Sequence, residues 1–217
     1  MSDLADQPTS TYRTISSTVP FRSARVIDVR TDQVAMPDGG TATRDVVVHP
    51  GAVGIIAMDD HERVLLLQQY RHATGRLLWE PPAGLLDVVE EDPVVAAKRE
   101  LYEEAHLEAQ RWDVLVDAYT SPGMTDEAVR IYLAREVRES AEPKFEAEHE
   151  EVDMPTRWVP LAEAVDAVLA GRVHNPLAVM GVLAVSAASR TSYAELRPAG
   201  APWPEMSDYP GSSNAPA

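Results

Sequence analysis

Apolar residues in this chain form strand patterns in some segments and repeat at helical spacing in others, and together these predict a mixed α/β protein. Two continuous apolar runs, 51–58 and 64–71, flank a polar turn at 59–62 and are typical of buried strands. Shorter strand patterns lie near 24–29, 44–49, 112–119, 128–137 and 156–159. Apolar positions at helical spacing and helix-start signals predict helices over 93–107, 161–170 and 175–188. This alternation favours an α/β/α sandwich with a mixed sheet between helices.

The same pattern divides the chain into four regions. Residues 1–18 are polar and rich in Ser and Thr, and are predicted to be a flexible N-terminus. Residues 19–48 predict a small antiparallel sheet with a hairpin turn at 37–40. The α/β domain is expected over 49–197. Residues 198–217 are rich in Pro, Gly, Ser and Ala and are predicted to be disordered.

Composition narrows the classes of partner. The 217 residues include 35 acidic and 19 basic side chains, a net charge of −16, which argues against a nucleic-acid binder. The chain has no cysteine, so disulfides and zinc-thiolate sites are excluded. The first residues lack the basic start and apolar core of a signal peptide, and no apolar run approaches the roughly 18 residues of a membrane span. We therefore expect a cytoplasmic protein that binds neither nucleic acid nor membranes.

The stretch from Gly84 to Leu107 carries the strongest chemical signal. Asp92 and Pro93 are a typical N-cap and first-turn pair, so a helix should begin there. One arginine and three carboxylates then follow at spacings of one, three and four residues: Arg99, Glu100, Glu103 and Glu104. Carboxylates crowded on one face repel one another unless cations lie between them, and oxygen ligands of this kind suit Mg²⁺ or Mn²⁺. A solvated acidic helix is the common alternative for such a run.

This segment resembles the Nudix box. Arg99–Glu104 matches the Arg-Glu-aliphatic-x-Glu-Glu core of that motif at every position, and Glu91 lies where the motif has its first glutamate. Two departures occur. The loop after Gly84 has one residue more than the motif, and His106 stands where the family has glycine, at a helix end that normally takes a left-handed conformation.

The resemblance implies a metal-dependent hydrolase of the Nudix α/β/α fold. Glu100 and Glu104 would each give a carboxylate to the metals, and Glu103 could bridge or bind a second ion. The main-chain oxygen of Ala83, just before the box glycine, is a further metal ligand in the family. Arg99 would orient the carboxylate of Glu103 through an (i, i+4) pair. Mg²⁺ is the expected cofactor, with Mn²⁺ as the alternative.

Further details are similar to the ADP-ribose pyrophosphatase branch of that family. The run Trp79–Gly84 resembles the branch's Glu-x-Pro-Ala-Gly, and Ser121-Pro122-Gly123 follows the box where the branch has its proline. A Ser-Pro-Gly tripeptide on its own is only a turn, so its position gives it weight. The branch also carries a small antiparallel sheet before the Nudix domain, like the one predicted over 19–48, and uses it in a homodimer. This likeness implies hydrolysis of ADP-ribose to AMP and ribose 5-phosphate.

The resemblance also implies a glutamate from outside the box that positions the attacking water, as a base or as a further metal ligand. The acidic segment 145–154 offers it, and alignment favours Glu151, with Glu150 and Glu148 behind it. A solvated loop is the alternative for any one of these residues.

Residues for substrate binding are expected near the strand ends that border the cleft: Arg44, Arg71, Glu80 and Met124. Arg71 could fork onto a diphosphate, although an arginine after a buried strand is about as often a surface charge. Two other functions stay open. One is hydrolysis of another nucleoside diphosphate derivative, such as a nucleotide sugar, a dinucleotide or an oxidised nucleotide. The other is a non-catalytic domain that senses ADP-ribose, which the complete set of box residues argues against.

Overall fold

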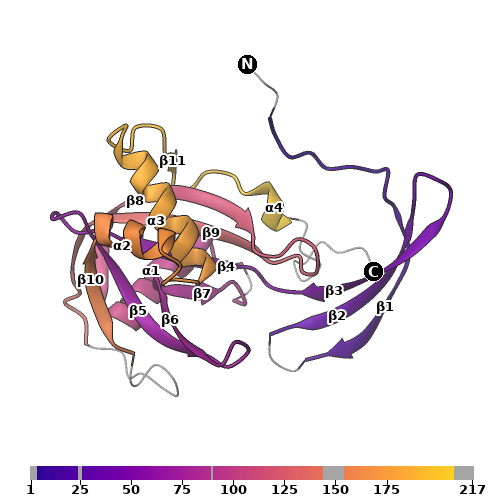
Figure 1. The fold of residues 1–217 in the computed structure, drawn as a ribbon, viewed down its shortest axis with the longest axis horizontal. Coiled ribbons are helices and arrows are strands. Elements are labelled where there is room, and N and C mark those ends of the chain that lie inside the picture. The colour runs from indigo at the N-terminus through magenta and orange to yellow at the C-terminus, as the bar shows by residue number, and fades with distance from the viewer. Residues whose placement is uncertain (1–3, 24–25, 89, 144–153, 208–217) are drawn as a thin grey trace. The chain divides into compact units, whose positions relative to one another are not determined.

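The computed structural model describes residues 4–23, 26–88, 90–143 and 154–207 (Figure 1). The chain forms two compact units. One contains Met1–Pro50 together with Ser121–Glu127, and the other contains Gly51–Thr120 together with Ala128–Ala217. In the described residues, no helix has both the length and the apolar character needed to cross a membrane.

The first unit contains a three-stranded antiparallel sheet. Its strands are β1 (Thr14–Arg22), β2 (Asp28–Ala35) and β3 (Thr41–Val48), in the order β1-β2-β3. At the turn between β2 and β3, the Met36 N–H donates to the Gly40 carbonyl (2.9 Å) and Gly39 has a φ of 84°. A positive φ suits glycine, which explains the residue at this position. The predicted hairpin is confirmed.

Strand β1 corrects the predicted boundary of the N-terminal region. It begins at Thr14, within the stretch expected to be flexible, and every side chain in it is exposed. Main-chain pairing with β2 holds it, and Thr14 is opposite Val34 in the register. Because no side chain of β1 is buried, the sequence has no burial pattern there from which the strand start could be read.

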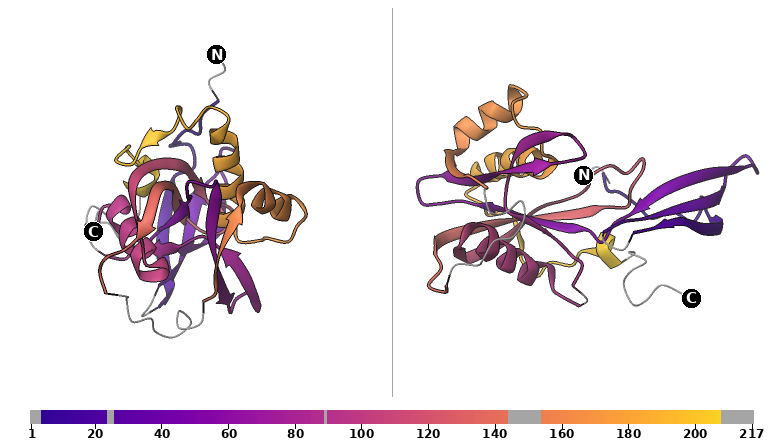
Figure 2. Two further views of the ribbon diagram at one scale, coloured as in Figure 1. Left: turned by 90° about the vertical axis from the view of Figure 1, so that its left-hand side faces the viewer. Right: turned by 90° about the horizontal axis from the view of Figure 1, so that it is seen from below.

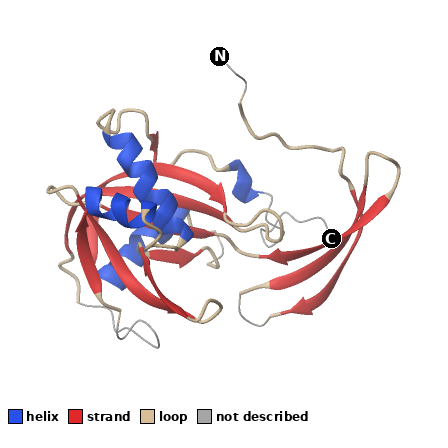
Figure 3. Ribbon diagram, in the orientation of Figure 1, coloured by secondary structure: helices blue, strands red, loops and turns tan. Residues whose placement is uncertain are grey.

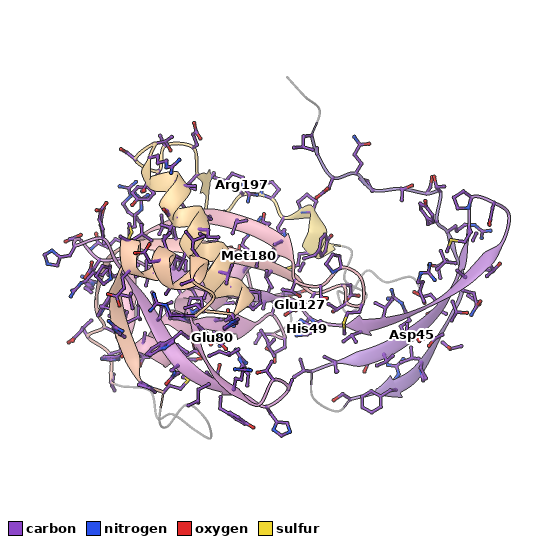
Figure 4. All side chains as sticks on the ribbon, in the orientation of Figure 1. Asp45, His49, Glu80, Glu127, Met180 and Arg197 are labelled. Carbon is purple, nitrogen blue, oxygen red and sulfur yellow. The ribbon has the colours of Figure 1, made fainter. Side chains whose placement is uncertain are left out.

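Residues 121–127 join this unit through hydrogen bonds to β3 and to the residue that follows it. The Val47 N–H donates to the Met124 carbonyl (2.8 Å), and the His49 N–H donates to Asp126 Oδ1 (2.9 Å). His49 Nδ1 also lies 3.6 Å from Glu127 Oε1, and Figure 4 labels both residues.

In its described residues, the second unit holds two sheets and four helices. Its strands are β4 (Ala52–Ala57), β5 (Arg63–Arg71), β6 (Arg76–Glu80), β7 (Ala83–Leu85), β8 (Leu107–Tyr119), β9 (Ala128–Glu139), β10 (Thr156–Pro160) and β11 (Arg197–Pro198). Its helices are α1 (Pro93–Ala105), α2 (Leu161–Leu169), α3 (Pro176–Ser189) and α4 (Pro204–Ser207). The larger sheet has the order β11-β8-β9-β4-β7, with β4 parallel to β9 and the other neighbours antiparallel, and the smaller has the order β10-β5-β6. The predicted mixed sheet is confirmed (Figure 3).

Strand β4 is buried on both faces, as its continuous apolar sequence predicts. Val53 and Ile55 belong to the core cluster that includes the buried side of α1, while Ile56 belongs to the cluster that includes α2 and α3. Helix α3 approaches the strand so closely that a Cβ on Gly181 would lie 2.6 Å from Ile56 Cδ1. Helix α1 therefore covers one face of the sheet and α2 and α3 the other, the expected α/β/α layering (Figure 2).

Side-chain caps fix the starts of the two long helices. Asp92, just before Pro93, accepts a hydrogen bond at Oδ1 from the Val94 N–H (2.9 Å). Asn175, just before Pro176, accepts one at Oδ1 from the Ala178 N–H (3.0 Å). Such caps contribute about 1 kcal/mol each. Both predicted helix starts are confirmed.

The polar turn before β5 is held by Asp59. Its carboxylate accepts from the main-chain N–H of His61 and Arg63 (2.9 Å each) and from Arg63 Nε (2.7 Å). Burial alone would raise the pKa of Asp59, but the hydrogen bonds from Arg63 and His61 outweigh it and lower that pKa. The Asp59 carboxylate therefore stabilises this turn in its charged form.

The C-terminal region also differs from its prediction. Residues 198–207 were expected to be disordered, whereas β11 and α4 lie in or next to this stretch and Trp203 is 9% exposed. Burial of one large aromatic ring supplies apolar contact that the Pro- and Gly-rich composition does not indicate.

Candidate active site

The site begins where strand β7 passes helix α1. A Cβ placed on Gly84 would lie 2.1 Å from Glu100 Cδ and Oε1, so only glycine lets the Glu100 side chain pack against this strand. Val53 of β4 pairs with Gly84, and this pairing fixes the strand in the sheet. The box glycine therefore makes room for the first carboxylate of the helix.

Arg99 is the centre of the charged cluster on α1. Its Nε and Nη2 donate to the two carboxylate oxygens of Glu91 (3.2 and 3.0 Å), and its Nη1 donates to Glu100 (2.6 Å) and Glu103 (3.1 Å). Hydrogen bonds with Glu91, followed by the charge of Glu100, raise the pKa of Arg99 well above its ordinary value. The expected pair between Arg99 and Glu103 is present.

Glu91 has a larger part in this cluster than the sequence indicated. It forms the bidentate pair with Arg99, although it was recognised only as the first glutamate of the box. Before the helix, the Glu91 N–H donates to the Val88 carbonyl (3.2 Å) and Glu90 has a φ of 63°. Glu91 thus reaches Arg99 although the loop is one residue longer than in the motif.

Glu104 is oriented by Ala83, the residue of β7 just before the box glycine. The Ala83 N–H donates to Glu104 Oε2 (3.0 Å), which brings the two predicted metal-binding positions together. Helix α1 then ends at His106, whose φ of 55° and ψ of 36° are left-handed, as its place in the motif predicted.

The donors gathered here suit a hard divalent cation in their chemistry. Glu100, Glu103, Glu104 and the Ala83 carbonyl offer oxygen only. Arg99 donates hydrogen bonds to two of these carboxylates, and in the described parts of the chain no three His, Asp or Glu side chains form a group that could hold a metal ion. A divalent ion would therefore compete with Arg99 for Glu100 and Glu103.

Comparison with known proteins decides the family. The model of the NUDIX domain matches residues 48–178. This chain belongs to the Nudix family. It is 50% identical over 192 residues, 88% of its length, to the ADP-ribose pyrophosphatase of Mycobacterium tuberculosis, of which 91% is covered. It is 35% identical to the ADP-ribose pyrophosphatase of Bacillus subtilis (strain 168), with 70% of this chain and 81% of the relative aligned.

A solved structure supports the Nudix fold. The crystal structure of an ADP compounds hydrolase superposes with a TM-score of 0.72 at 20% identity, covering 86% of this chain and 98% of that one. The family and the fold expected from the box are therefore confirmed, and the chain is a Nudix hydrolase.

Two of the expected substrate-binding residues of the Nudix domain lie together. Arg71, at the end of β5, donates through Nε and Nη2 to the carboxylate of Glu80 at the end of β6, with distances of 2.6–3.1 Å. The side chain of Glu80 is 1% exposed and that of Arg71 is 46% exposed. Figure 4 labels Glu80. The buried carboxylate holds the arginine in one orientation.

The other predicted residues fall elsewhere. Arg44, on β3, and Met124 belong to the first unit, where Arg44 is exposed and Met124 is 58% exposed. Glu151, like Glu150 and Glu148, lies outside the described residues. Their roles stay predictions.

Proposed function

We propose that this Nudix hydrolase cleaves the pyrophosphate bond of ADP-ribose to give AMP and ribose 5-phosphate, in a reaction that requires a divalent metal. The observation that carries the proposal is 50% identity over 88% of the chain to a relative named ADP-ribose pyrophosphatase. The complete charged cluster of the box supports a catalytic over a merely sensing domain.

The box residues would hold the metal and keep it in place. Glu100, Glu103, Glu104 and the main-chain oxygen of Ala83 are the proposed ligands, and Mg²⁺ is the proposed ion with Mn²⁺ as the alternative. When bound, the metal neutralises charge on the phosphoryl oxygens and activates water. Arg99 is itself held by Glu91, so it orients the Glu103 carboxylate from a fixed position.

The attacking water needs a base or a positioning carboxylate. Glu151 is proposed for this role and as a further metal ligand, with Glu150 and Glu148 as alternatives. Arrival of this carboxylate with the substrate would limit idle hydrolysis. The Glu151→Gln variant tests the assignment, because it keeps the shape of the side chain and removes its basicity; an unchanged kcat would sink it.

Substrate binding is proposed for Arg71, Arg44, Met124 and, through Arg71, Glu80. The orientation of Arg71 is set by the buried Glu80, while about half of its side chain faces solvent. A guanidinium oriented in this way suits an anionic diphosphate. Because Glu80 is buried, we propose that it acts by orienting Arg71.

A homodimer that forms through the sheet of residues 19–48, in the cytoplasm, completes the proposal. Ile15, Val19 and Phe21 of β1 are exposed to 50%, 39% and 54%. Large apolar side chains gathered on one strand are typical of a surface that a partner covers. Sedimentation velocity of the purified protein tests the dimer.

The first experiment measures release of AMP from ADP-ribose, ADP-sugars, NADH and diadenosine polyphosphates, with Mg²⁺ and then with chelator. A clearly higher kcat/KM for ADP-ribose that is lost on chelation is expected. Glu100→Gln is the control, since it removes a proposed ligand without changing side-chain size. Turnover of another compound would replace the substrate, and binding of ADP-ribose without turnover of any compound would assign the protein to the sensing class.

A further inference from the structure

The C-terminal residues 197–206, called the clasp from here on, are attached to the central sheet by main chain and by charge. Strand β11 pairs with β8, with Arg197 opposite Val114 in the register. Arg197, labelled in Figure 4, donates through Nη1 to Asp117 Oδ2 (2.8 Å). Both links lie within the Nudix unit.

Arg130 of β9 ties the middle of the clasp to the sheet. Its side chain is 2% exposed, and its Nε and Nη2 donate to the carboxylate of Asp117 (2.7 and 2.9 Å). It also donates to the carbonyls of Ala201 (2.7 Å) and Pro202 (3.1 Å), and its guanidinium lies 4.8 Å from the centre of the Trp203 ring. A buried arginine with this many partners fixes the clasp in one position.

Trp203 carries this attachment to helix α1. It belongs to the same buried cluster as Ala96 and Ala97 of the helix. An open surface pocket of about 310 Å³ has Trp203 and Met206 among its lining residues, together with Asp92 and Pro93 at the start of α1. The clasp therefore borders the N-terminal end of the box helix across this pocket.

The start of α1 is next to the residue that holds the charged cluster. Glu91 directly precedes the N-cap Asp92, and its carboxylate takes two of the hydrogen bonds of Arg99. If this end of the helix shifts, Arg99 loses its hydrogen bonds to Glu91. It then pairs more strongly with Glu100 and Glu103, which are proposed metal ligands. Stronger pairing with Arg99 leaves these carboxylates less available to a cation.

We propose that Trp203 is a positioning residue for the metal site, acting through the start of α1 and the Glu91–Arg99 pair. This inference rests on the metal-binding part of the proposed function and not on the identity of the substrate. Loss of the indole removes the ring that lies against the Arg130 guanidinium and widens the open pocket beside the start of α1. The affinity for the metal should then fall by more than partial unfolding of the variant alone explains.

The test measures binding of Mn²⁺ to the full chain by electron paramagnetic resonance, without nucleotide, alongside thermal melting. Trp203→Ala is expected to raise the Mn²⁺ Kd at least threefold, whereas Trp203→Phe, which keeps an aromatic ring under Arg130, stays within twofold of the wild type. Tyr193→Leu is the matched control. The Arg135 guanidinium lies 4.4 Å from the centre of the Tyr193 ring, and this ring packs against the core cluster of α2 and α3. The Tyr193→Leu variant therefore loses a similar contact at a place away from α1.

An equal change in Mn²⁺ Kd for Trp203→Ala and Tyr193→Leu, or no change for either, would overturn the proposal. If Trp203→Ala does not fold, Arg197→Ala removes a partly exposed attachment of the same clasp. Arg197→Ala must then also raise the Mn²⁺ Kd, and an unchanged Kd would refute the connection between the clasp and the metal site. Because no nucleotide is present, a wrong substrate assignment does not affect either outcome.

Discussion

Replacement of Gly84 by alanine should separate the stability of this protein from its activity. The added Cβ would lie 2.1 Å from the carboxyl carbon of Glu100. Carbon atoms in contact lie about 3.5 Å apart, so the carboxylate must move by roughly 1.4 Å. The atoms that must move are the Cγ and carboxylate of a flexible side chain, and therefore we expect a loss of only about 1 kcal/mol in unfolding free energy, the low end of the usual cost of overpacking.

The effect on catalysis should be far larger. A misplacement of about 1 Å at a catalytic group costs on the order of 100-fold, which is about 2.7 kcal/mol of transition-state free energy. We expect kcat/KM for ADP-ribose to fall by about this factor in Gly84→Ala, while the Tm falls by no more than about 4 °C. Gly200→Ala is the control, because in the described part of the chain no heavy atom beyond its two sequence neighbours lies within 4 Å of its added Cβ.

A double-mutant cycle identifies the route. If Gly84→Ala acts by displacing Glu100, combining it with Glu100→Gln should cost little more activity than Glu100→Gln alone. Fully additive losses would refute the reasoning, as would a kcat/KM for Gly84→Ala within twofold of the wild type. The activity of the wild type, the two single variants and the double variant is measured as AMP release at saturating and at limiting Mg²⁺.

Three further predictions test other parts of the structure. Arg99→Ala leaves neighbouring carboxylates without their counter-charge, so the Tm in chelator should fall by about 3–6 °C and Mg²⁺ should restore part of it; no difference between the two conditions would contradict this. His106→Gly relieves a left-handed residue at the end of α1 and should raise the Tm by about 2–4 °C, whereas His106→Ala should not raise it. The pKa of Asp59 is lowered on folding, so its charged form stabilises the protein above its ordinary value of 3.8 and that contribution is lost as pH falls through the lower folded pKa. The Tm difference between wild type and Asp59→Asn should therefore be full at neutral pH and shrink on acidification, and a difference that grows as pH falls would show the opposite sign.

The parts of the fold that could be predicted are those with local signals. Asp92 and Asn175 each precede a proline at a helix start, and the runs of β4 and β5 are apolar over their whole buried length. Helix α1 also carries a motif whose residues lie within a few positions of one another. In these cases, the residues that determine the structure are neighbours in the sequence.

The parts that could not be predicted depend on partners distant in the sequence. Strand β6 pairs with β5, and its Glu80 is buried because Arg71 folds back onto it. The burial of Trp203 depends on Arg130, which lies far from it along the chain. Neither Glu80 nor Trp203 has a neighbour in the sequence that indicates such a contact. A contact between residues far apart in the chain leaves no signal in the sequence pattern of either segment.

The short segment Ser121–Glu127 has a consequence for how this protein could have been assembled in evolution. It lies between β8 and β9 of the Nudix unit in sequence, yet it bonds to β3 and belongs to the N-terminal unit. A single recombination event at residue 50 would carry away the three-stranded sheet and leave behind the loop that binds Val47 and His49. The N-terminal sheet is therefore no freely exchangeable module, and its sequence and that of the loop are expected to change together among descendants of the same gene.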